Sequence, residues 1–550
     1  MRKTILSRGV RALASIDRPA QGGSLFAMES GLYVVMKITF LGHAGFDVRN
    51  AGGGRLVCDP WLTDAGAFLN SWYQFPQNHH LADSVASLDP EHDLLYISHH
   101  HRDHFDRDFL RRLNKDIQLC VPRFVRRHFV NELKSLGFHR IREMLFGDSV
   151  EIHGFRLTLF VDDCYTNEDS GILIEADGAK FLNMNDCRAY DRLATTSLRG
   201  LDLFTIQFSG ASWFPSVYDY TDQERDQHSH FKNQRKFHNI SNLINRLEPR
   251  LYVPSAGPPC FLDSALQRFN YGQPSPFPDA REFFEILKEL PRRFEYIFPS
   301  DVIEIGHGLE PEVRTLSGMD ATFYLPENKR RYIQDYADRM KARCQFEAEG
   351  KDPWPDLLSA AQQKVAALPQ PLAVPRPLVF SVTEHPTQPD RHVLCDLNQR
   401  TAAAVDGRDL PADIYQYSFT SRVLTKFFET GEMWEDLMLS LRFRIHRSPD
   451  EFDPIIADFV RLQLPDLRRY PFAHHEEERI RRTIGGVEYE FDRYCPHNNG
   501  DLLHADVVDG HLVCPRHGWC FSLSNAGACS ENHTTINCKP VEHVDTASSL

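Results

Sequence analysis

The sequence lacks any run of 18 consecutive apolar residues, so it predicts no membrane-spanning helix. It also lacks an excess of positive charge, because 62 Lys and Arg against 76 Asp and Glu give a formal net charge of −14. This balance argues against a nucleic-acid or anionic-membrane partner, although a local basic pocket for one phosphorylated ligand stays compatible with it. Twelve cysteines in 550 residues are too few for a disulfide scaffold. We therefore expect a protein of the reducing cytoplasm.

A secretory signal is missing too. The first 30 or so residues are basic and then small and polar, without the apolar centre of a signal peptide. We expect residues 1–35 to be a disordered or non-native leader. The remaining length is too great for one hydrophobic core, so several domains are expected.

Strand patterns dominate the region from Lys37 to Gly308. Stretches such as "KITFLGHAGFDV", "DLLYIS" and "LDLFTIQF" alternate with helical stretches around residues 107–114, 124–136 and 232–247. The mixture predicts an α/β domain over residues 36–310, with two sheets and helices packed outside them.

The pattern changes after residue 310. We expect a helical segment and a Pro-rich linker over 311–390, because prolines recur between Pro353 and Pro389. An amphipathic stretch interrupted by Gly431 predicts an α+β region over 391–470. Residues 471–545 are rich in strands and turns and predict a small all-β domain.

This last domain carries the clearest motif. Cys495-Pro-His497 is followed by Cys514-Pro-Arg-His517, so each of two loops offers one thiolate and one imidazole. A Rieske 2Fe-2S cluster needs this ligand set, with cysteines on one iron and histidines on the other, and its potential lies between about −150 and +300 mV. A structural Cys2His2 zinc site is the alternative, but a zinc finger usually keeps its two cysteines together.

The segment 475–542 resembles Rieske proteins, and "CPRHGW" is similar to their ferredoxin and oxygenase branch. The respiratory branch adds a disulfide-forming cysteine in each loop. The resemblance places Gly500 and Arg516 at those positions.

A second motif, "YISHHHRDHFD", follows a predicted buried strand. Its His99, His101, Asp103 and His104 fit H-x-H-x-D-H, a spacing that directs two histidines to one metal and the Asp-His pair to a second. The pattern resembles the metallo-β-lactamase superfamily, an αββα sandwich. That resemblance implies a bridging carboxylate at Asp186.

The chain departs from hydrolases of that superfamily at two places. Where those hydrolases have a third histidine, this chain has "FVDDCY", which offers Asp162 or Asp163, and we take Asp163 as the ligand. Where they have a late histidine, this chain has "LYVPSAGPPCF", which offers no imidazole. Two histidines and a carboxylate are the ligands of many non-haem iron centres, so we expect one or two irons, although zinc or manganese remains compatible.

Together, the two motifs and the segments 208–220 and 231–263 resemble the CMP-N-acetylneuraminate hydroxylases. The resemblance implies a monooxygenase that uses dioxygen and NAD(P)H-derived electrons, delivered by a reductase and a ferredoxin or cytochrome, on a small polar metabolite such as a nucleotide sugar. The vertebrate enzymes carry their Rieske domain first, whereas here it comes last. Either a strap brings the cluster back to the metal, or a second subunit of a homo-oligomer supplies it.

Two other functions stay open. A metal-dependent hydrolase could carry the Rieske module as a redox switch, and it would contain zinc and need no reductant. An electron-transfer or sensor protein would make no product.

The predicted helix 232–247 carries three basic residues. Lys232, Arg235 and Lys236 could bind a phosphate or carboxylate or form a solvated helix face.

Overall fold

A computed structural model describes residues 26–28, 31–33, 35–194, 196, 198–210, 212–272, 274–344, 351–385, 387–470, 478–497, 499–529 and 534–541. Most of the expected leader lies outside these residues, as do the first seven and last four residues of the expected 471–545 domain. A short hairpin, β1 (Phe26–Met28) and β2 (Gly31–Tyr33), precedes the first domain. No helix in the described ranges is both long and apolar enough to cross a membrane.

The first domain contains two large sheets. The eight-stranded sheet has the order β16-β15-β3-β4-β5-β6-β7-β8, and the six-stranded sheet has the order β14-β13-β12-β11-β10-β9. In chain order the strands are β3 (Val35–Gly42), β4 (Gly45–Arg49), β5 (Arg55–Cys58), β6 (Asp93–Tyr96), β7 (Gln118–Pro122), β8 (Ile141–Met144), β9 (Ser149–Ile152), β10 (Phe155–Cys164), β11 (Asn167–Ala176), β12 (Ala179–Asn183), β13 (Leu203–Gln207), β14 (Leu251–Ser255), β15 (Val302–Gly306) and β16 (Glu312–Arg314).

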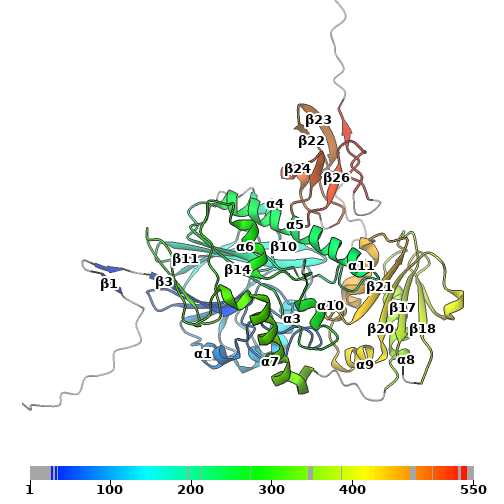
Figure 1. The fold of residues 1–550 in the computed structure, drawn as a ribbon, viewed down its shortest axis with the longest axis horizontal. Helices are drawn as coiled ribbons and strands as arrows, with labels where there is room; N and C mark the ends of the chain where they lie inside the picture. Colours follow the sequence, from blue (N-terminus) through cyan, green and yellow to red (C-terminus); the bar gives the residue numbers. More distant parts are fainter. Residues whose placement is uncertain are drawn as a thin grey trace, which may run out of the picture.

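Apolar side chains from the two sheets meet in one core. Val57 and Leu95 of the first sheet share it with Leu159 and Ile172 of the second, and all four are fully buried. In the described part of the chain, the helices beside the sheets are α1 (Ala82–Ala86), α2 (Arg107–Arg112), α3 (His128–Ser135), α4 (Tyr190–Ala194), α5 (Asp222–Leu247), α6 (Ala280–Leu287) and α7 (Pro326–Cys344). Figure 1 shows α5 and α6 beside the second sheet and α1 and α3 beside the first. The predicted layering of two sheets between helices is confirmed.

The middle domain corrects one prediction. The stretch 353–389 is not a linker: it contains α8 (Trp354–Ala367) and β17 (Leu378–Thr383), and β17 is the central strand of a five-stranded sheet. Pro355 lies in the first turn of α8, and the prolines from 369 to 377 lie between α8 and β17. The prolines therefore mark the boundaries of elements, where a missing amide hydrogen costs little.

This sheet has the order β19-β18-β17-β20-β21 and is covered by short helices. Gly431 ends α9 in a left-handed conformation with φ 65°, which explains the break in the amphipathic pattern. The further elements are β18 (Arg391–Asp396), β19 (Thr401–Val405), β20 (Ile414–Thr420), α9 (Ser421–Thr430), α10 (Trp434–Leu439), β21 (Phe443–Ser448), α11 (Pro454–Arg461) and α12 (Leu464–Leu467).

The C-terminal domain has two three-stranded antiparallel sheets and a small core of its own around Phe491, Leu512 and Phe521. Its strands are β22 (Arg479–Ile484), β23 (Val487–Asp492), β24 (Asp506–Val508), β25 (His511–Val513), β26 (Cys520–Ser522) and β27 (Lys539–Pro540). In Figure 1 this domain stands over α4 and α5 of the first domain, with α11 of the middle domain beside its tip. The expected all-β fold is confirmed.

Candidate functional site

The predicted histidines meet where β6 ends. The loop turns tightly after the strand, with the amides of His104 and Phe105 donating to the carbonyl of His101. His99 Nε2 lies 2.8 Å from His101 Nδ1, and the rings of His99 and His104 are 4.3 Å apart. The parallel strands β5, β6 and β7 all end at this edge, which is where open α/β sheets place their ligands.

Carboxylates from both sheets converge on His104. Its Nδ1 lies 2.8 Å from Oδ2 of Asp59, which follows β5. That contact orients the ring so that Nε2 faces Asp186 Oδ1 at 3.5 Å and Asp103 Oδ2 at 4.0 Å. Asp186 follows β12 of the second sheet, so the site spans the two sheets. The structure therefore brings together five predicted site residues: His99, His101, Asp103, His104 and Asp186.

Except for the partly exposed His101, these groups are buried, and several of their polar atoms lack a partner in the described part of the chain. Among the described residues, His104 Nε2, Asp103 Oδ1 and Asp186 Oδ1 are buried without a hydrogen-bond partner. Buried polar atoms rarely lack partners, so ligand atoms aimed at a common point without bonding fit a metal ion. The donor atoms of His99, His104 and Asp186 lie within 4.8 Å of one another, as do those of His43, Asp103 and His104. Imidazole and carboxylate donors suit iron, zinc or manganese.

The charges of the site agree with this fit. Burial lowers the pKa of His99 well below its usual value, and the neighbouring His104 lowers it further, so His99 is a neutral imidazole. Burial also opposes the charge on His104, but Asp186 and Asp103 outweigh it and raise its pKa. Burial and the adjacent Asp186 raise the pKa of Asp169 well above normal. A cation would relieve this crowding of carboxylates.

The position of Asp163 contradicts its predicted role. Its side chain is 44% exposed and pairs with Arg192 at 2.8 Å. Successive residues of a strand point to opposite faces, so Asp162 is fully buried while Asp163 faces outward. The carboxylate that joins the histidines is Asp169 on β11, whose Oδ1 lies 3.3 Å from His99 Nδ1. Asp169 is paired in register with Asp162, so the sequence pointed to the right hairpin and the wrong strand.

Two further groups were not predicted. His43, in the turn after β3, places Nε2 3.0 Å from Asp103 Oδ2. Glu435, at the start of α10 in the middle domain, lies 3.6 Å from His101 Nε2 and 3.4 Å from His100 Nε2. His100 thus faces the middle domain, and its ring packs edge-on against His128. The "HAG" turn was a visible signal for His43, whereas nothing in the sequence linked Glu435 to residues more than 300 positions away.

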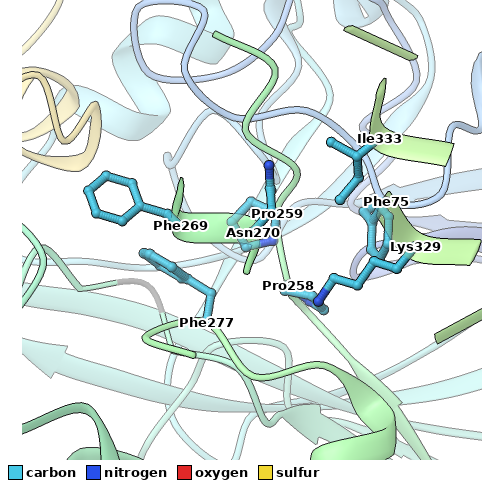
Figure 2. A pocket seen from close by; sticks show the side chains of 8 residues that line it. All are labelled: Phe75, Pro258, Pro259, Phe269, Asn270, Phe277, Lys329 and Ile333. Carbon is cyan, nitrogen blue, oxygen red and sulfur yellow. The ribbon is translucent and has the colours of Figure 1, made fainter. Parts of the chain in front are cut away.

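The segment without a late histidine lies directly at the site. The amide of Ala256 donates to the carbonyl of His43, and a Cβ on Gly257 would come within 2.7 Å of Ser209 Cβ. The chain then turns away, and Pro258 and Pro259 line a small crevice (Figure 2). Its other lining residues are Phe75, Phe269, Asn270, Phe277, Lys329 and Ile333. Apart from Lys329 and Asn270 the lining is apolar, and the crevice contains none of the site's imidazoles or carboxylates.

The two C-terminal loops have the same hydrogen-bond pattern. The amide of Cys495 donates to the carbonyl of Gly500, five residues on, and the amide of Cys514 donates likewise to Trp519. Cys495 and Cys514 are buried, and the rings of His497 and His517 lie 4.6 Å apart. The structure therefore brings the four predicted cluster ligands together at one tip.

The electrostatics of this tip favour the ligating forms of Cys514 and His517, whereas Cys495 would give up its proton on binding iron. The hydrogen bond from Cys495 lowers the pKa of Cys514, while burial and Cys514 raise the pKa of Cys495. Burial lowers the pKa of His517 well below normal, which keeps its imidazole neutral. Thiolate and neutral imidazole are the forms that ligate iron.

Family models match both sites. Residues 37–189 match the beta-lactamase superfamily domain, and residues 476–542 match the Rieske [2Fe-2S] domain. A Rieske 2Fe-2S iron-sulfur protein of Mycolicibacterium smegmatis is 28% identical over 535 residues, covering 92% of this chain and all of the relative. A protein of Mycobacterium tuberculosis with the same description is 29% identical over 531 residues, 90% of this chain and 98% of its own.

Other relatives match a part of the chain. The cytidine monophosphate-N-acetylneuraminic acid hydroxylase of Mus musculus is 29% identical over 237 residues, which are 40% of this chain and 39% of the relative. Among solved structures, the diiron beta-hydroxylase CmlA of Streptomyces venezuelae matches with a TM-score of 0.34 and 18% identity, covering 50% of this chain and 54% of its own. The chain combines a metallo-β-lactamase-like domain with a C-terminal Rieske domain that holds a 2Fe-2S cluster.

Proposed function

We propose that the chain is a Rieske-dependent non-haem iron monooxygenase. The observation that carries the proposal is the presence, in one chain, of the four ligands of a Rieske cluster at one tip and of a buried imidazole and carboxylate site. A Rieske cluster transfers single electrons and makes no bonds in a substrate, so a second centre must use those electrons.

His99, His101, Asp103, His104 and Asp186 would hold one or two irons, with Asp169 and His43 beside them. Iron at this site would supply oxygen insertion, in which one atom of dioxygen enters a substrate C–H bond and the other leaves as water, consuming two electrons and two protons. NAD(P)H would supply the electrons through a reductase and a ferredoxin or cytochrome. The protein itself excludes water, since His99, His104 and Asp103 are at most 2% exposed.

The substrate that we propose is a small anion, and a nucleotide sugar such as CMP-N-acetylneuraminate is one candidate. Lys236 Nζ and an Arg188 guanidinium nitrogen both donate to Gln207 Oε1. Both cations lie against Gly210, where a Cβ would be 3.1 Å from Lys236 Nζ and 3.7 Å from the arginine. Burial and Arg188 lower the pKa of Lys236 well below its usual value, while Asp186 opposes this shift, which relates these basic side chains to the metal site.

These cations need a negative partner. Neither Arg188 nor Lys236 forms an ion pair with a carboxylate of the described residues, and Lys232 donates to backbone carbonyls. Burial and the nearby Arg188 lower the pKa of Lys232 to about 7. A phosphate or carboxylate bound here would restore its charge. The helix face predicted as either solvated or anion-binding thus turns Lys232 and Lys236 inward.

The test of the function combines metal analysis with EPR spectroscopy. The dithionite-reduced protein should give the EPR signal of a reduced His-ligated 2Fe-2S centre and should contain iron beyond the two ions of the cluster. Asp186→Ala should lose that additional iron and all product while keeping the cluster signal. Stoichiometric zinc with no additional iron would refute the proposal.

A metal-dependent hydrolase is the second candidate, favoured by the H-x-H-x-D-H loop and the match to the beta-lactamase superfamily. It predicts turnover without reductant. Comparing product formation with and without an electron donor separates the two functions.

A further inference from the structure

An arginine inside the second cluster loop reaches into the first domain. Arg516 lies between Cys514 and His517 and is 4% exposed. Its Nη1 donates to Asp162 Oδ1 at 2.9 Å, and its Nε lies 3.3 Å from Asp191 Oδ2. Asp162 belongs to β10 and Asp191 to α4, so one guanidinium joins the cluster tip to two elements of the metallo-β-lactamase-like domain.

The first cluster loop meets the same anchor. The amide of Asp501, next to Gly500, donates to Asp191 Oδ2 at 2.9 Å. Both cluster loops therefore contact one carboxylate. Because that carboxylate is 4% exposed, its contacts are little screened by solvent.

Other contacts surround this anchor. Asn239 of α5 donates to the carbonyl of Pro515, and a Cβ on Gly518 would lie 2.9 Å from Arg235 Cβ, so the backbone of the loop rests on α5. From the middle domain, Phe452 packs edge-on against His497 and Trp519. The cluster tip thus fits between the two other domains of the same chain.

The anchor is also connected to the metal site. Asp162 faces Asp169 directly across the antiparallel pair β10–β11, and directly opposed residues project to the same face of a sheet. Asp169 Oδ1 contacts His99 Nδ1. Two side-chain contacts, Arg516 to Asp162 and Asp169 to His99, and the strand pairing of Asp162 with Asp169 therefore lead from the cluster loop to a predicted metal ligand.

We propose that Arg516 is a positioning residue that docks the Rieske tip onto Asp162 and Asp191 of its own chain, and that electrons pass across this contact to the site at His99. A cluster held at this tip would lose one electron in each transfer, a metal held by His99 and Asp186 would gain it, and the external donor would then reduce the cluster again. The inference rests on the proposed function for the use of the electrons, although the docking itself does not depend on it.

The test measures docking without turnover. The metal-stripped holo-cluster protein is loaded with paramagnetic Co²⁺ or diamagnetic Zn²⁺, and the relaxation of the reduced cluster signal is followed by EPR power saturation. Nearby Co²⁺ should speed the relaxation in the native chain. Arg516→Met leaves two buried carboxylates without their cation, so it should lower the docking equilibrium constant by about 100- to 1,000-fold or more and abolish the effect of Co²⁺.

Arg481→Met is the matched control, because Arg481 is 59% exposed and pairs with Glu490 inside the Rieske domain. It should keep the native relaxation. Asp162→Asn, which preserves shape and removes charge, should weaken docking from the other side of the contact. Hydrogen exchange gives a second measurement: α4 and the β10–β11 hairpin should lose protection in Arg516→Met and not in Arg481→Met.

Mixing two chains distinguishes docking within a chain from docking between chains. One chain keeps the cluster but lacks the metal through Asp186→Ala, and the other holds Co²⁺ but lacks the cluster through Cys495→Ala. Docking within the chain predicts no faster relaxation in the mixture. Fast relaxation in the mixture, or native relaxation and protection in Arg516→Met, overturns the inference. Intact docking in a protein that forms no product refutes the proposed function and leaves the docking standing.

Discussion

Gly500 offers a sharp test of the cluster geometry. A Cβ at this position would lie 2.8 Å from Cys514 Sγ, whereas ordinary contacts are 3.4–4 Å. The substitution Gly500→Ala therefore requires the sulfur or the loop to move by at least about 0.6 Å. Metal–ligand distances tolerate about 0.2 Å, so Cys514 would leave its ligating position.

The backbone cannot easily absorb this shift. Cys495 is hydrogen-bonded to the carbonyl of Gly500 itself, and the new methyl group would also lie 3.3 Å from Arg516 Cγ and Cδ. We expect Gly500→Ala to fold, because the core of the domain around Phe491 and Phe521 is untouched, but to lose most of its cluster. Cluster content is measured by iron and sulfide analysis, by visible absorbance and by EPR of the reduced protein.

Gly510→Ala is the control. Gly510 has φ 75° and nothing within 4 Å of its would-be Cβ, so this variant carries a backbone strain of about 1 kcal/mol without any contact. It should retain the cluster. A Gly500→Ala protein with full cluster content and a native EPR signal would refute the argument, because the sulfur would then not be confined as described.

Two further predictions concern buried charges. Asp169→Asn should lower the metal affinity of the histidine site by about 10- to 100-fold, because an amide cannot ionise beside His99 when a cation binds. Asp163→Asn should bind metal normally, since Asp163 faces outward. Equilibrium dialysis of both variants measures the difference. Burial lowers the pKa of Lys364, whose Nζ lies 4.9 Å from the Trp434 ring centre, to about 7. Between about pH 7 and about pH 10.5 the amine of Lys364 is protonated in the unfolded chain and neutral in the folded chain. The free energy of unfolding therefore rises with pH through this window. At and below pH 7, burial of the charged lysine lowers the free energy of unfolding by up to about 5 kcal/mol. Lys364→Met should raise the midpoint of thermal unfolding most near pH 7. A difference in midpoint between the variant and the native protein that does not shrink as the pH rises would contradict this reasoning.

Local patterns predicted most of the fold. The strand at "DLLYIS" is β6, the helix expected at 107–114 is α2, and the all-β character of the last domain follows from its turns. These predictions succeed because periodicity and turn residues report on the chain within a few positions. The prolines between 353 and 377 misled the prediction for the same reason, since a proline pattern does not tell a linker from the edges of a packed helix and strand.

The site was predictable where its ligands lie close together in the sequence. His99, His101, Asp103 and His104 occupy one loop, and each pair of cluster ligands occupies another. Asp169 was missed because its role depends on the register of β10 and β11, which places it opposite Asp162 and beside His99. Glu435 was missed because it arrives from another domain, and such a contact leaves no pattern in the sequence.

The docking arginine and the small residue beside the cluster form one structural device. The resemblance to Rieske proteins places Gly500 and Arg516 where the respiratory branch, unlike the ferredoxin and oxygenase branch, has disulfide-forming cysteines. In this structure the two positions are adjacent, because a Cβ on Gly500 would lie 3.3 Å from the Arg516 side chain. With glycine on one side, the arginine stem crosses the gap between the loops and its guanidinium reaches Asp162 and Asp191. A disulfide there would tie the loops to each other, whereas an arginine ties them to the neighbouring domain. The exchange thus suits a Rieske domain that lies last in the chain and must still bring its cluster to a site more than 300 residues earlier.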